Sequence, residues 1–272
     1  GEGSIMSQGG FAMVTRGSRR CAKGKGRGPR YVPSASADQE DDLSTDAIVA
    51  KVSSSVEALR QTSWFSQVTG VVLSHLSALE TASDSSAASP RPGVGAARDM
   101  VCYGIGHFSR SRASQLQAAL AVLLKESCGV GGSAWLFDPV LTPNERAAAQ
   151  ELGFTMLDEN EVGLRRVEAT TLFYMPHCGR RLYSNVLRAN WSPLLLAKAP
   201  IFGNSFSEYG LRLLDARSRG SCCVSRLASR DVCHETPLPP FSEEGPFQDM
   251  SMHSFPPGRV CEEGGGAGFW DL

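Results

Sequence analysis

A glycine turn that follows a short apolar run is the first feature of this sequence that could do chemistry. Gly104 and Gly106 open a G-x-G-x-x-S pattern that also contains His107. Glycines at this place let a phosphate or carboxylate approach the backbone at the start of a helix. Asp138 follows the next apolar run, where an acidic residue suits a ribose diol. The pattern predicts nucleotide or S-adenosylmethionine binding; the alternative is a structural turn and helix cap, because serine replaces the third glycine.

A histidine and a cysteine stand side by side after another apolar run, in the sequence Met-Pro-His-Cys. His177 has the chemistry of a base or metal ligand, and Cys178 that of a nucleophile. Neighbouring residues on an extended chain point in opposite directions, so a partner from another loop, such as His107, would be needed. The structural alternative is that His177 bonds backbone carbonyls and orders the turn.

Asn204 and Ser205 follow a further apolar run and have two interpretations. Either they line a pocket with the other candidates, or they cap the next helix, as these side chains commonly do. Two other histidines are interpreted without a catalytic role: His75 lies within a helix, and His253 is a surface or packing residue. No metal site is predicted, because none of the 8 cysteines forms a C-x-x-C pair.

The elements that must position these side chains alternate between strand and helix. Alternation of this kind is typical of an α/β fold with right-handed crossovers. We therefore predict a mainly parallel Rossmann-like sheet with helices on both faces, followed after Glu208 by one helix and an extended proline-rich chain to Phe255. The predicted strands are residues 100–103, 134–137, 154–157, 170–174 and 200–202, and the predicted helices are residues 111–126, 142–152 and 180–191. Thr142 and Glu145 form a predicted capping box at the start of the second of these helices.

The ends of the strands give this topology a functional consequence. In a parallel sheet the carboxyl ends of all strands share one edge, where the N-termini of helices also gather. We therefore expect one cleft at this edge, on which five of the candidate residues converge and to which the others contribute. The five are Gly104, Gly106, Asp138, His177 and Asn204; His107, Cys178 and Ser205 complete the candidate ligand-binding site.

By composition, the chain divides into four segments. Residues 1–42 form a basic tail that is predicted to be disordered, with a nuclear signal or an RNA contact as the functional alternative. Residues 43–97 carry two amphipathic helical patterns, the first capped by Ser44, and a Ser- and Pro-rich linker. Residues 98–256 form the α/β domain, and residues 257–272 a flexible tail.

The totals of the sequence exclude several classes of protein. With 27 basic and 28 acidic residues, direct nucleic-acid binding is not expected outside the basic tail. No apolar run approaches the roughly 18 residues that span a bilayer, so no membrane association is predicted. Several cysteines lie in or beside apolar stretches, which favours a reducing compartment: the cytoplasm, with the nucleus as a further location.

The motifs at the strand ends, taken together, resemble the Sensitivity-to-Red-light-Reduced-like family. The resemblance covers about residues 100–256, and its most specific part is the Phe-Tyr-Met-Pro-His-Cys sequence at residues 173–178. The order and spacing of the motifs make it more specific than the glycine turn alone. The other matching segments are residues 103–108, Phe137-Asp138-Pro139 with Glu145, residues 182–185 and 189–191, residues 203–206 with Tyr209, residues 237–239, Phe247 and residues 251–256.

This resemblance implies a regulatory protein without an established catalytic activity. It implies roles in the circadian clock and light signalling in plants, and in clock-gene expression and haem biosynthesis in animals. The implied partners are proteins or a small ligand at the strand-end cleft. Candidate ligands are S-adenosylmethionine, a nucleotide and haem, the last with His177 or Cys178 as axial ligand. The alternative function is a transferase that uses S-adenosylmethionine or a nucleotide.

Overall fold

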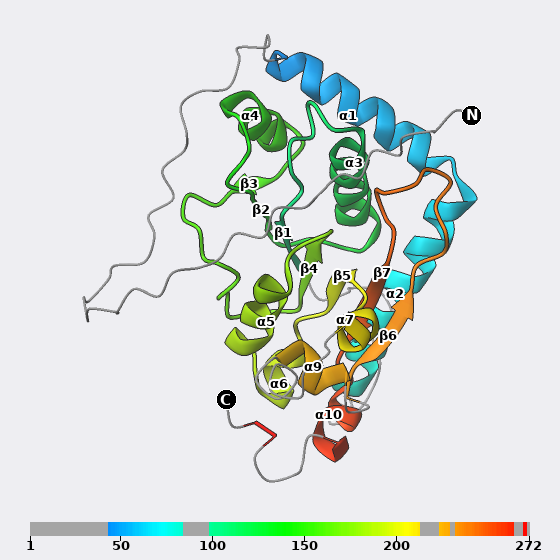
Figure 1. Cartoon of the computed structure of the whole chain (residues 1–272), viewed down its shortest axis with the longest axis vertical. Helices are drawn as coiled ribbons and strands as arrows, with labels where there is room; N and C mark the ends of the chain where they lie inside the picture. The colour runs from blue at the N-terminus through cyan, green and yellow to red at the C-terminus, as the bar shows by residue number, and fades with distance from the viewer. Residues whose placement is uncertain (1–42, 84–97, 213–222, 229–231, 264–268, 271–272) are drawn as a thin grey trace, which may run out of the picture. The chain divides into compact units, whose positions relative to one another are not determined.

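The computed structural model describes residues 43–83, 98–212, 223–228, 232–263 and 269–270. Within these residues a seven-stranded sheet carries helices on both of its faces (Figure 1). The predicted α/β fold with a helical N-terminal segment is therefore confirmed. The tail predicted at residues 1–42 and most of the predicted linker lie outside the described residues.

The strands of the sheet follow the order β3-β2-β1-β4-β5-β7-β6. The first five strands in this order are parallel to one another. Strand β7 pairs antiparallel with β5, and β6 pairs antiparallel with β7, so these two strands extend the sheet. The order reverses between β1 and β4, which in such folds is the usual place for a ligand. The strands are β1 Asp99–Tyr103, β2 Ala134–Phe137, β3 Thr155–Met156, β4 Thr171–Met175, β5 Ile201–Asn204, β6 His234–Pro237 and β7 Met250–Ser254.

Helices of two groups cover the two faces of the sheet. The first group packs in one hydrophobic cluster and contains α1 Thr45–Arg60, α2 Ser63–Ser83, α3 Arg112–Ser127 and α4 Pro143–Glu151. The second group packs in another cluster and contains α5 Arg180–Ala189, α6 Pro193–Leu196, α7 Phe206–Arg212, α9 Cys223–Ala228 and α10 Pro257–Glu263.

Strand β1 shows why its run of apolar residues forms the centre of the sheet. Met100 and Cys102 point into the first cluster, whereas Val101 and Tyr103 point into the second. All four are at most 2% exposed. A strand covered on both faces needs a continuous apolar run, because successive side chains alternate between the faces. The predicted strands before residue 205 are accordingly found in the parallel part of the sheet.

Helix α1 begins at the serine that the sequence indicated as its cap. The Ala47 N–H donates to Ser44 Oγ at 3.3 Å, which satisfies one of the free amides of the first turn. Ile48, Val52 and Leu59 recur at helical spacing and are at most 3% exposed. They turn the apolar face of α1 toward α3 and α4, on which the helix packs.

The chain after Glu208 differs from the prediction of one helix and an extended segment. Two helices, α7 and α9, occur among the described residues, and β6 and β7 add two strands to the sheet. His253 pairs with Ile201 in this extension and is fully buried, so it is a packing residue. The prediction missed these strands because β6 reads His-Glu-Thr-Pro, which has no apolar alternation of its own.

The C-terminal end of the chain contributes one more helix to the fold. Within the segment predicted as a flexible tail, residues 257–263 form helix α10, and Val260 is buried in the second cluster. None of the helices that the structure describes is both long and apolar enough to cross a bilayer.

Candidate functional site

The carboxyl ends of β1, β2, β4 and β5 lie at one edge of the sheet, because these strands are parallel. These strand ends and the loops that follow them carry every candidate residue of the sequence. The site is therefore built from three loop pairs, one joining the ends of β1 and β2, one joining β1 and β4, and one joining β4 and β5.

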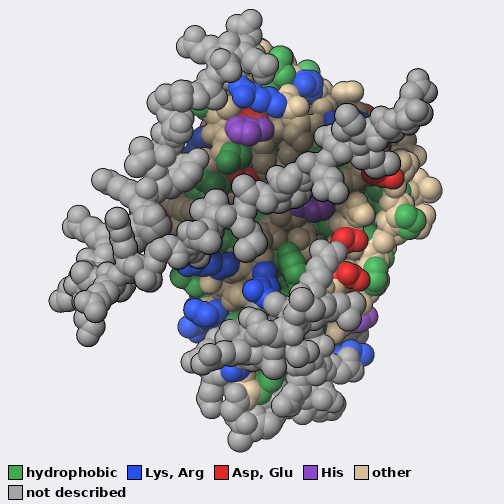
Figure 2. Space-filling model, viewed as in Figure 1, with side chains coloured by type: hydrophobic (Ala, Val, Ile, Leu, Met, Phe, Trp, Pro, Cys, Tyr) green, Lys and Arg blue, Asp and Glu red, His purple; other side chains and the backbone are tan. Residues whose placement is uncertain are grey.

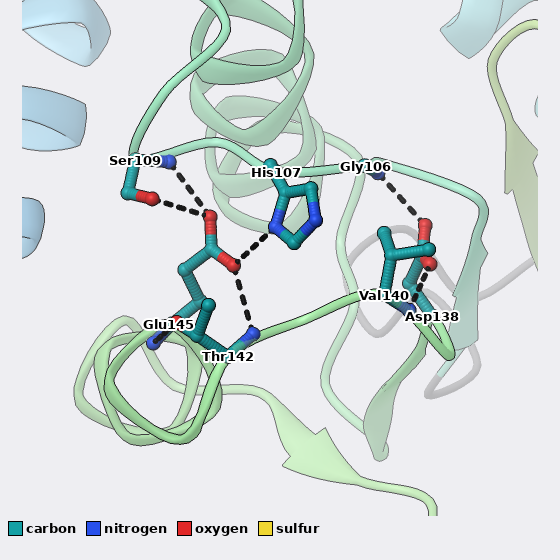
Figure 3. Close-up of polar contacts among 7 residues, drawn as sticks. All are labelled: Gly106, His107, Ser109, Asp138, Val140, Thr142 and Glu145. Atoms are coloured by element: carbon teal, nitrogen blue, oxygen red, sulfur yellow. Dashed lines mark hydrogen bonds and ion pairs between the residues drawn. The ribbon is translucent and has the colours of Figure 1, made fainter. Parts of the chain in front are cut away.

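The glycine turn after β1 is bonded to the end of β2. The Gly106 N–H donates to Asp138 Oδ2 at 2.8 Å, and Asp138 Oδ1 accepts from the Val140 N–H at 3.0 Å (Figure 3). Asp138 is only 6% exposed. The amide that would face a phosphate in a nucleotide site thus holds a carboxylate of the same chain. An incoming phosphate would have to displace Asp138 and would be repelled by its charge.

Glu145 joins the same turn to helix α4, and its side chain is fully buried. It accepts hydrogen bonds from Ser109 N–H at 2.9 Å, from Ser109 Oγ at 2.7 Å and from His107 Nδ1 at 3.0 Å (Figure 3). It also closes the predicted capping box with Thr142. Burial opposes the charge of Glu145, but the bonds from Ser109, Thr142 and His107 outweigh it and lower its pKa.

The bond to Glu145 fixes the orientation of His107. Its Nδ1 donates to the carboxylate, which leaves Nε2 as the second polar atom of a partly exposed ring. The sequence indicated Glu145 as a helix-capping residue, and that was correct, but its contact with a loop 36 to 38 residues earlier was not predicted. The signal was the G-x-G-x-x-S pattern itself, whose serine supplies two of the bonds.

The reversal point between β1 and β4 is filled by Cys178. Gly104 has a φ of +71°, and a Cβ at this position would lie 2.5 Å from Cys178 Sγ. The thiol donates to the Tyr103 carbonyl at 3.3 Å and is 7% exposed. Burial raises the pKa of Cys178 to about 12, so the thiol is protonated at neutral pH and is a weak nucleophile. Cys178 is a free cysteine.

The backbone of His177 adopts a left-handed conformation with φ +49°, which is unusual for a residue other than glycine. Its N–H donates to Asn204 Oδ1 at 2.8 Å, and its Nε2 lies 3.1 Å from the Pro246 carbonyl. Asn204 Nδ2 in turn donates to Tyr209 Oη at 2.8 Å. These contacts match the structural alternative, in which His177 bonds a backbone carbonyl and orders the turn. They leave the imidazole at the surface.

Tyr183 on α5 joins the ends of β4 and β5 beside this turn. Its hydroxyl donates to the Met175 carbonyl and accepts from the Asn204 N–H at 2.9 Å. A Cβ at Gly203 would lie 2.6 Å from the same hydroxyl, so the strand end needs glycine there. Ser205 acts as a helix cap, because its Oγ accepts from the Glu208 N–H at 3.1 Å.

Two neighbouring depressions open beside His177, between the end of β5 and the antiparallel extension. The smaller has a volume of about 270 Å³ and includes three of the candidate residues, His177, Asn204 and Ser205, in its lining. The larger, of about 540 Å³, lies against the segment between β6 and β7. Both are lined by Ser205, Glu208, Gly245, Gln248 and Asp249.

The structure therefore gathers the candidate residues at one edge, but in separate contacts. Gly104 lies against Cys178, and the Gly106 amide bonds Asp138. Of the candidate residues, only His177, Asn204 and Ser205 line the smaller depression. That the candidates form one ligand site stays a prediction. Sequence reasoning missed the contribution of residues 237–251, because it treated this segment as an extended chain without a role at the edge.

Among the residues that the structure describes, no group of three or more His, Cys, Asp and Glu side chains is arranged to hold a metal ion.

The strand order and the position of the polar loops define a Rossmann-like α/β domain with an antiparallel extension. The chain belongs to the SRR1 domain family, whose family model matches residues 80–254. The match spans β1 to β7 and all candidate residues of the edge. No solved structure matches the chain.

The chain is also similar in sequence to three named proteins. The chain is 35% identical over 220 residues to the SRR1-like protein of Mus musculus, covering 75% of this chain and 87% of that protein. It is 38% identical over 168 residues to Protein SENSITIVITY TO RED LIGHT REDUCED 1 of Arabidopsis thaliana, covering 60% of each. It is 29% identical over 158 residues to the SRR1-like protein of Drosophila melanogaster, covering 58% of this chain and 55% of that protein.

Proposed function

We propose that this chain is a regulatory protein of light responses and the circadian clock. It acts by binding a protein partner or a small ligand at the carboxyl edge of its sheet. The proposal extends to regulation of haem biosynthesis and to action in the cytoplasm and the nucleus. The observation that carries it is the match to the SRR1 domain family across the whole edge, including a relative named for reduced sensitivity to red light.

The geometry of the edge favours binding over catalysis. Asp138 and Glu145 are buried and bonded to amides of their own chain, and the thiol of Cys178 is buried and protonated. A transferase that holds a nucleotide or S-adenosylmethionine on the glycine turn would need the Gly106 amide, which Asp138 occupies. Haem ligation by His177 would need its bond to the Pro246 carbonyl to open.

The test is complementation of an Arabidopsis thaliana line that lacks its own relative. The full chain is expected to restore the growth response to red light and the period of a clock-gene reporter. Failure to restore either response, with the protein present at normal abundance, would contradict the proposal. A thermal-shift screen of nucleotides, S-adenosylmethionine and haem identifies a small ligand, since saturation at 100 times Kd adds roughly 2.7 kcal/mol.

Variants of His177 separate a binding role from a structural one. His177→Ala and His177→Gly both remove the imidazole, but glycine also relieves the left-handed backbone strain. If the imidazole binds the partner, both variants lose complementation while stability is retained, and glycine does not restore activity. Glu151→Gln, an exposed change on α4, is the matched control and should complement fully.

A further inference from the structure

The larger depression beside the extension is lined by two chemically different sets of residues. One set is apolar and contains Leu238, Phe241, Phe247 and Met250. The other contains four carboxylates, those of Glu208, Glu243, Glu244 and Asp249. Figure 2 shows acidic and apolar side chains next to one another over the ends of β5 and β7.

The apolar residues of the lining are held in place by contacts with helix α2. The Trp64 ring lies 4.6 Å from Phe241 and 4.7 Å from Phe247, measured between ring centroids, and its Nε1 donates to the Pro239 carbonyl at 2.9 Å. Phe241 and Phe247 are 5.0 Å apart. The wall is therefore preformed, which lowers the entropic cost of binding a partner on it.

Ser251 in β7 supplies an independent sign of a missing partner. It lines the same depression, it is 1% exposed, and its hydroxyl has no hydrogen-bond partner among the described residues. A buried hydroxyl without a partner is unfavourable, and such groups in native structures commonly await a ligand, an ion or a water. The hydroxyls of Ser109 and Tyr183 at the same edge of the sheet both form hydrogen bonds, whereas that of Ser251 does not.

The charge of the lining selects the kind of ligand. Glu243 is paired with Arg112 at 3.0 Å, and Glu244 is exposed to solvent. Among the described residues that line the two depressions, none is lysine or arginine. The lining thus combines carboxylates with aromatic rings, and this combination suits a cation with an apolar stem.

We propose that the larger depression binds an arginine-bearing segment of a partner protein, with the arginine stem on the partly exposed Phe241 ring, which Phe247 supports, and the guanidinium among the carboxylates. This inference rests on the proposed function, for which it names the chemistry of the partner. Arginine is favoured over lysine because its planar group stacks on aromatic rings and donates to several acceptors at once. The Ser251 hydroxyl accepts from a donor of the segment.

The experiment uses the immobilised full chain and pools of capped nonapeptides. One pool has arginine fixed at its centre, and the matched pool has citrulline, a neutral group of the same shape. Mass spectrometry of the retained peptides is expected to show enrichment of the arginine pool. The best peptide is then synthesised with a fluorescent label, and its affinity for each protein variant is measured by fluorescence polarisation.

Two substitutions test the two sides of the argument. Glu244→Gln removes one exposed charge and should weaken the peptide about threefold, with an effect that shrinks at high salt. Ser251→Ala should weaken it about fivefold, yet leave the unfolding midpoint unchanged or higher, since the hydroxyl has no partner in the free protein. Glu151→Gln on α4, outside the depression, is the control and should bind as the wild type does.

Several results would overturn the inference. Equal retention of the arginine and citrulline pools would remove the role of charge, and unchanged affinity in both Glu244→Gln and Ser251→Ala would place the peptide elsewhere. Competition by free spermidine at the affinity of the peptide would show that a small cation suffices. Any of these with intact complementation would refute this inference alone, whereas loss of complementation refutes the proposed function.

Discussion

The parallel part of the sheet and its antiparallel extension differ in how they satisfy their polar groups. At the parallel strand ends, Asp138 and Glu145 accept hydrogen bonds from neighbouring loops, and Cys178 fills the reversal point. At the extension, Ser251 keeps a buried hydroxyl without a partner beside the larger depression. The buried carboxylates of the first region are satisfied within the chain, whereas the second region leaves one buried hydroxyl unsatisfied.

This difference teaches that a glycine turn after a first strand does not require an external anion. The amide of Gly106 needs a negatively polarised acceptor, and the Asp138 carboxylate supplies one from the next strand. The loop geometry of a nucleotide site can therefore arise for purely internal reasons. Where the chain satisfies its own donors, the buried polar groups that it leaves without a partner are the better indication of a ligand site.

The largest expected effect is at Glu145, in the first region. Glu145→Ala leaves the amides of Ser109 and Thr142 and the imidazole of His107 without their acceptor in a buried place. We expect the free energy of unfolding to fall by about 3–5 kcal/mol, measured by urea denaturation at pH 7. Glu151→Ala, exposed on the same helix, should change it by less than about 0.5 kcal/mol. A loss below about 1 kcal/mol at Glu145 would break the comparison.

The second expected effect concerns pH and the extension. His75 docks α2 on the extension through bonds of 2.8 Å to Ser254 and Thr236. Burial, and then the nearby His234 and His253, lower its pKa to about 4. Between pH 6.5 and pH 4 the unfolded chain binds the extra proton, so this group's contribution to stability falls by about 3 kcal/mol as the pH decreases.

Comparison with His75→Gln isolates this contribution from the carboxylates that also titrate. The wild type should lose more unfolding free energy than the variant between pH 7 and pH 4.5, as followed by urea denaturation at each pH. The His234 ring stacks on His75 at 4.3 Å, so His234→Gln should reduce the slope only in part. Parallel curves for the wild type and His75→Gln would contradict the prediction.

The third effect tests whether the reversal point is truly filled. Gly104→Ala places a side chain at φ +71° and against Cys178 Sγ, so we expect a loss of about 2–3 kcal/mol. In the double variant Gly104→Ala/Cys178→Ala the steric part should disappear and about 1 kcal/mol of backbone strain remain, relative to Cys178→Ala alone. Simple additivity of the two substitutions would mean that the loops have room for a ligand there.

The smallest effect gives the sharpest contrast between the two regions, because the same substitution is made in each. Ser109→Ala removes a hydroxyl that donates to Glu145 at 2.7 Å and should cost about 1–2 kcal/mol. Ser251→Ala removes a hydroxyl without a partner and should leave the free energy of unfolding unchanged or raise it by up to about 1 kcal/mol. Equal losses, measured by urea denaturation, would show that Ser251 is satisfied in solution.

The amino-acid sequence by itself determined the parallel part of the sheet. Its strands are apolar on both faces, and apolar residues recur along its helices with a period of about 3.6 residues. Ser44 and Thr142 cap the helices α1 and α4. These signals are local, since each lies within about ten residues of the element that it specifies. Alternating strands and helices predict parallel strands joined by right-handed crossovers. The carboxyl ends of parallel strands share one edge of the sheet, so the common location of the candidate residues followed from the predicted topology alone.

The tertiary structure alone decided the extension and the contacts at the edge. Strand β6 has no apolar residue besides proline, and β7 contributes only Met250 and Met252 to the hydrophobic core. Both strands join the sheet because β5 offers a free edge and α2 covers them through His75. The bonds of Glu145 to Ser109 and of Gly106 to Asp138 join residues more than 30 positions apart. No local pattern can specify such pairs, because a hydrogen bond between distant loops depends on where the whole fold places them.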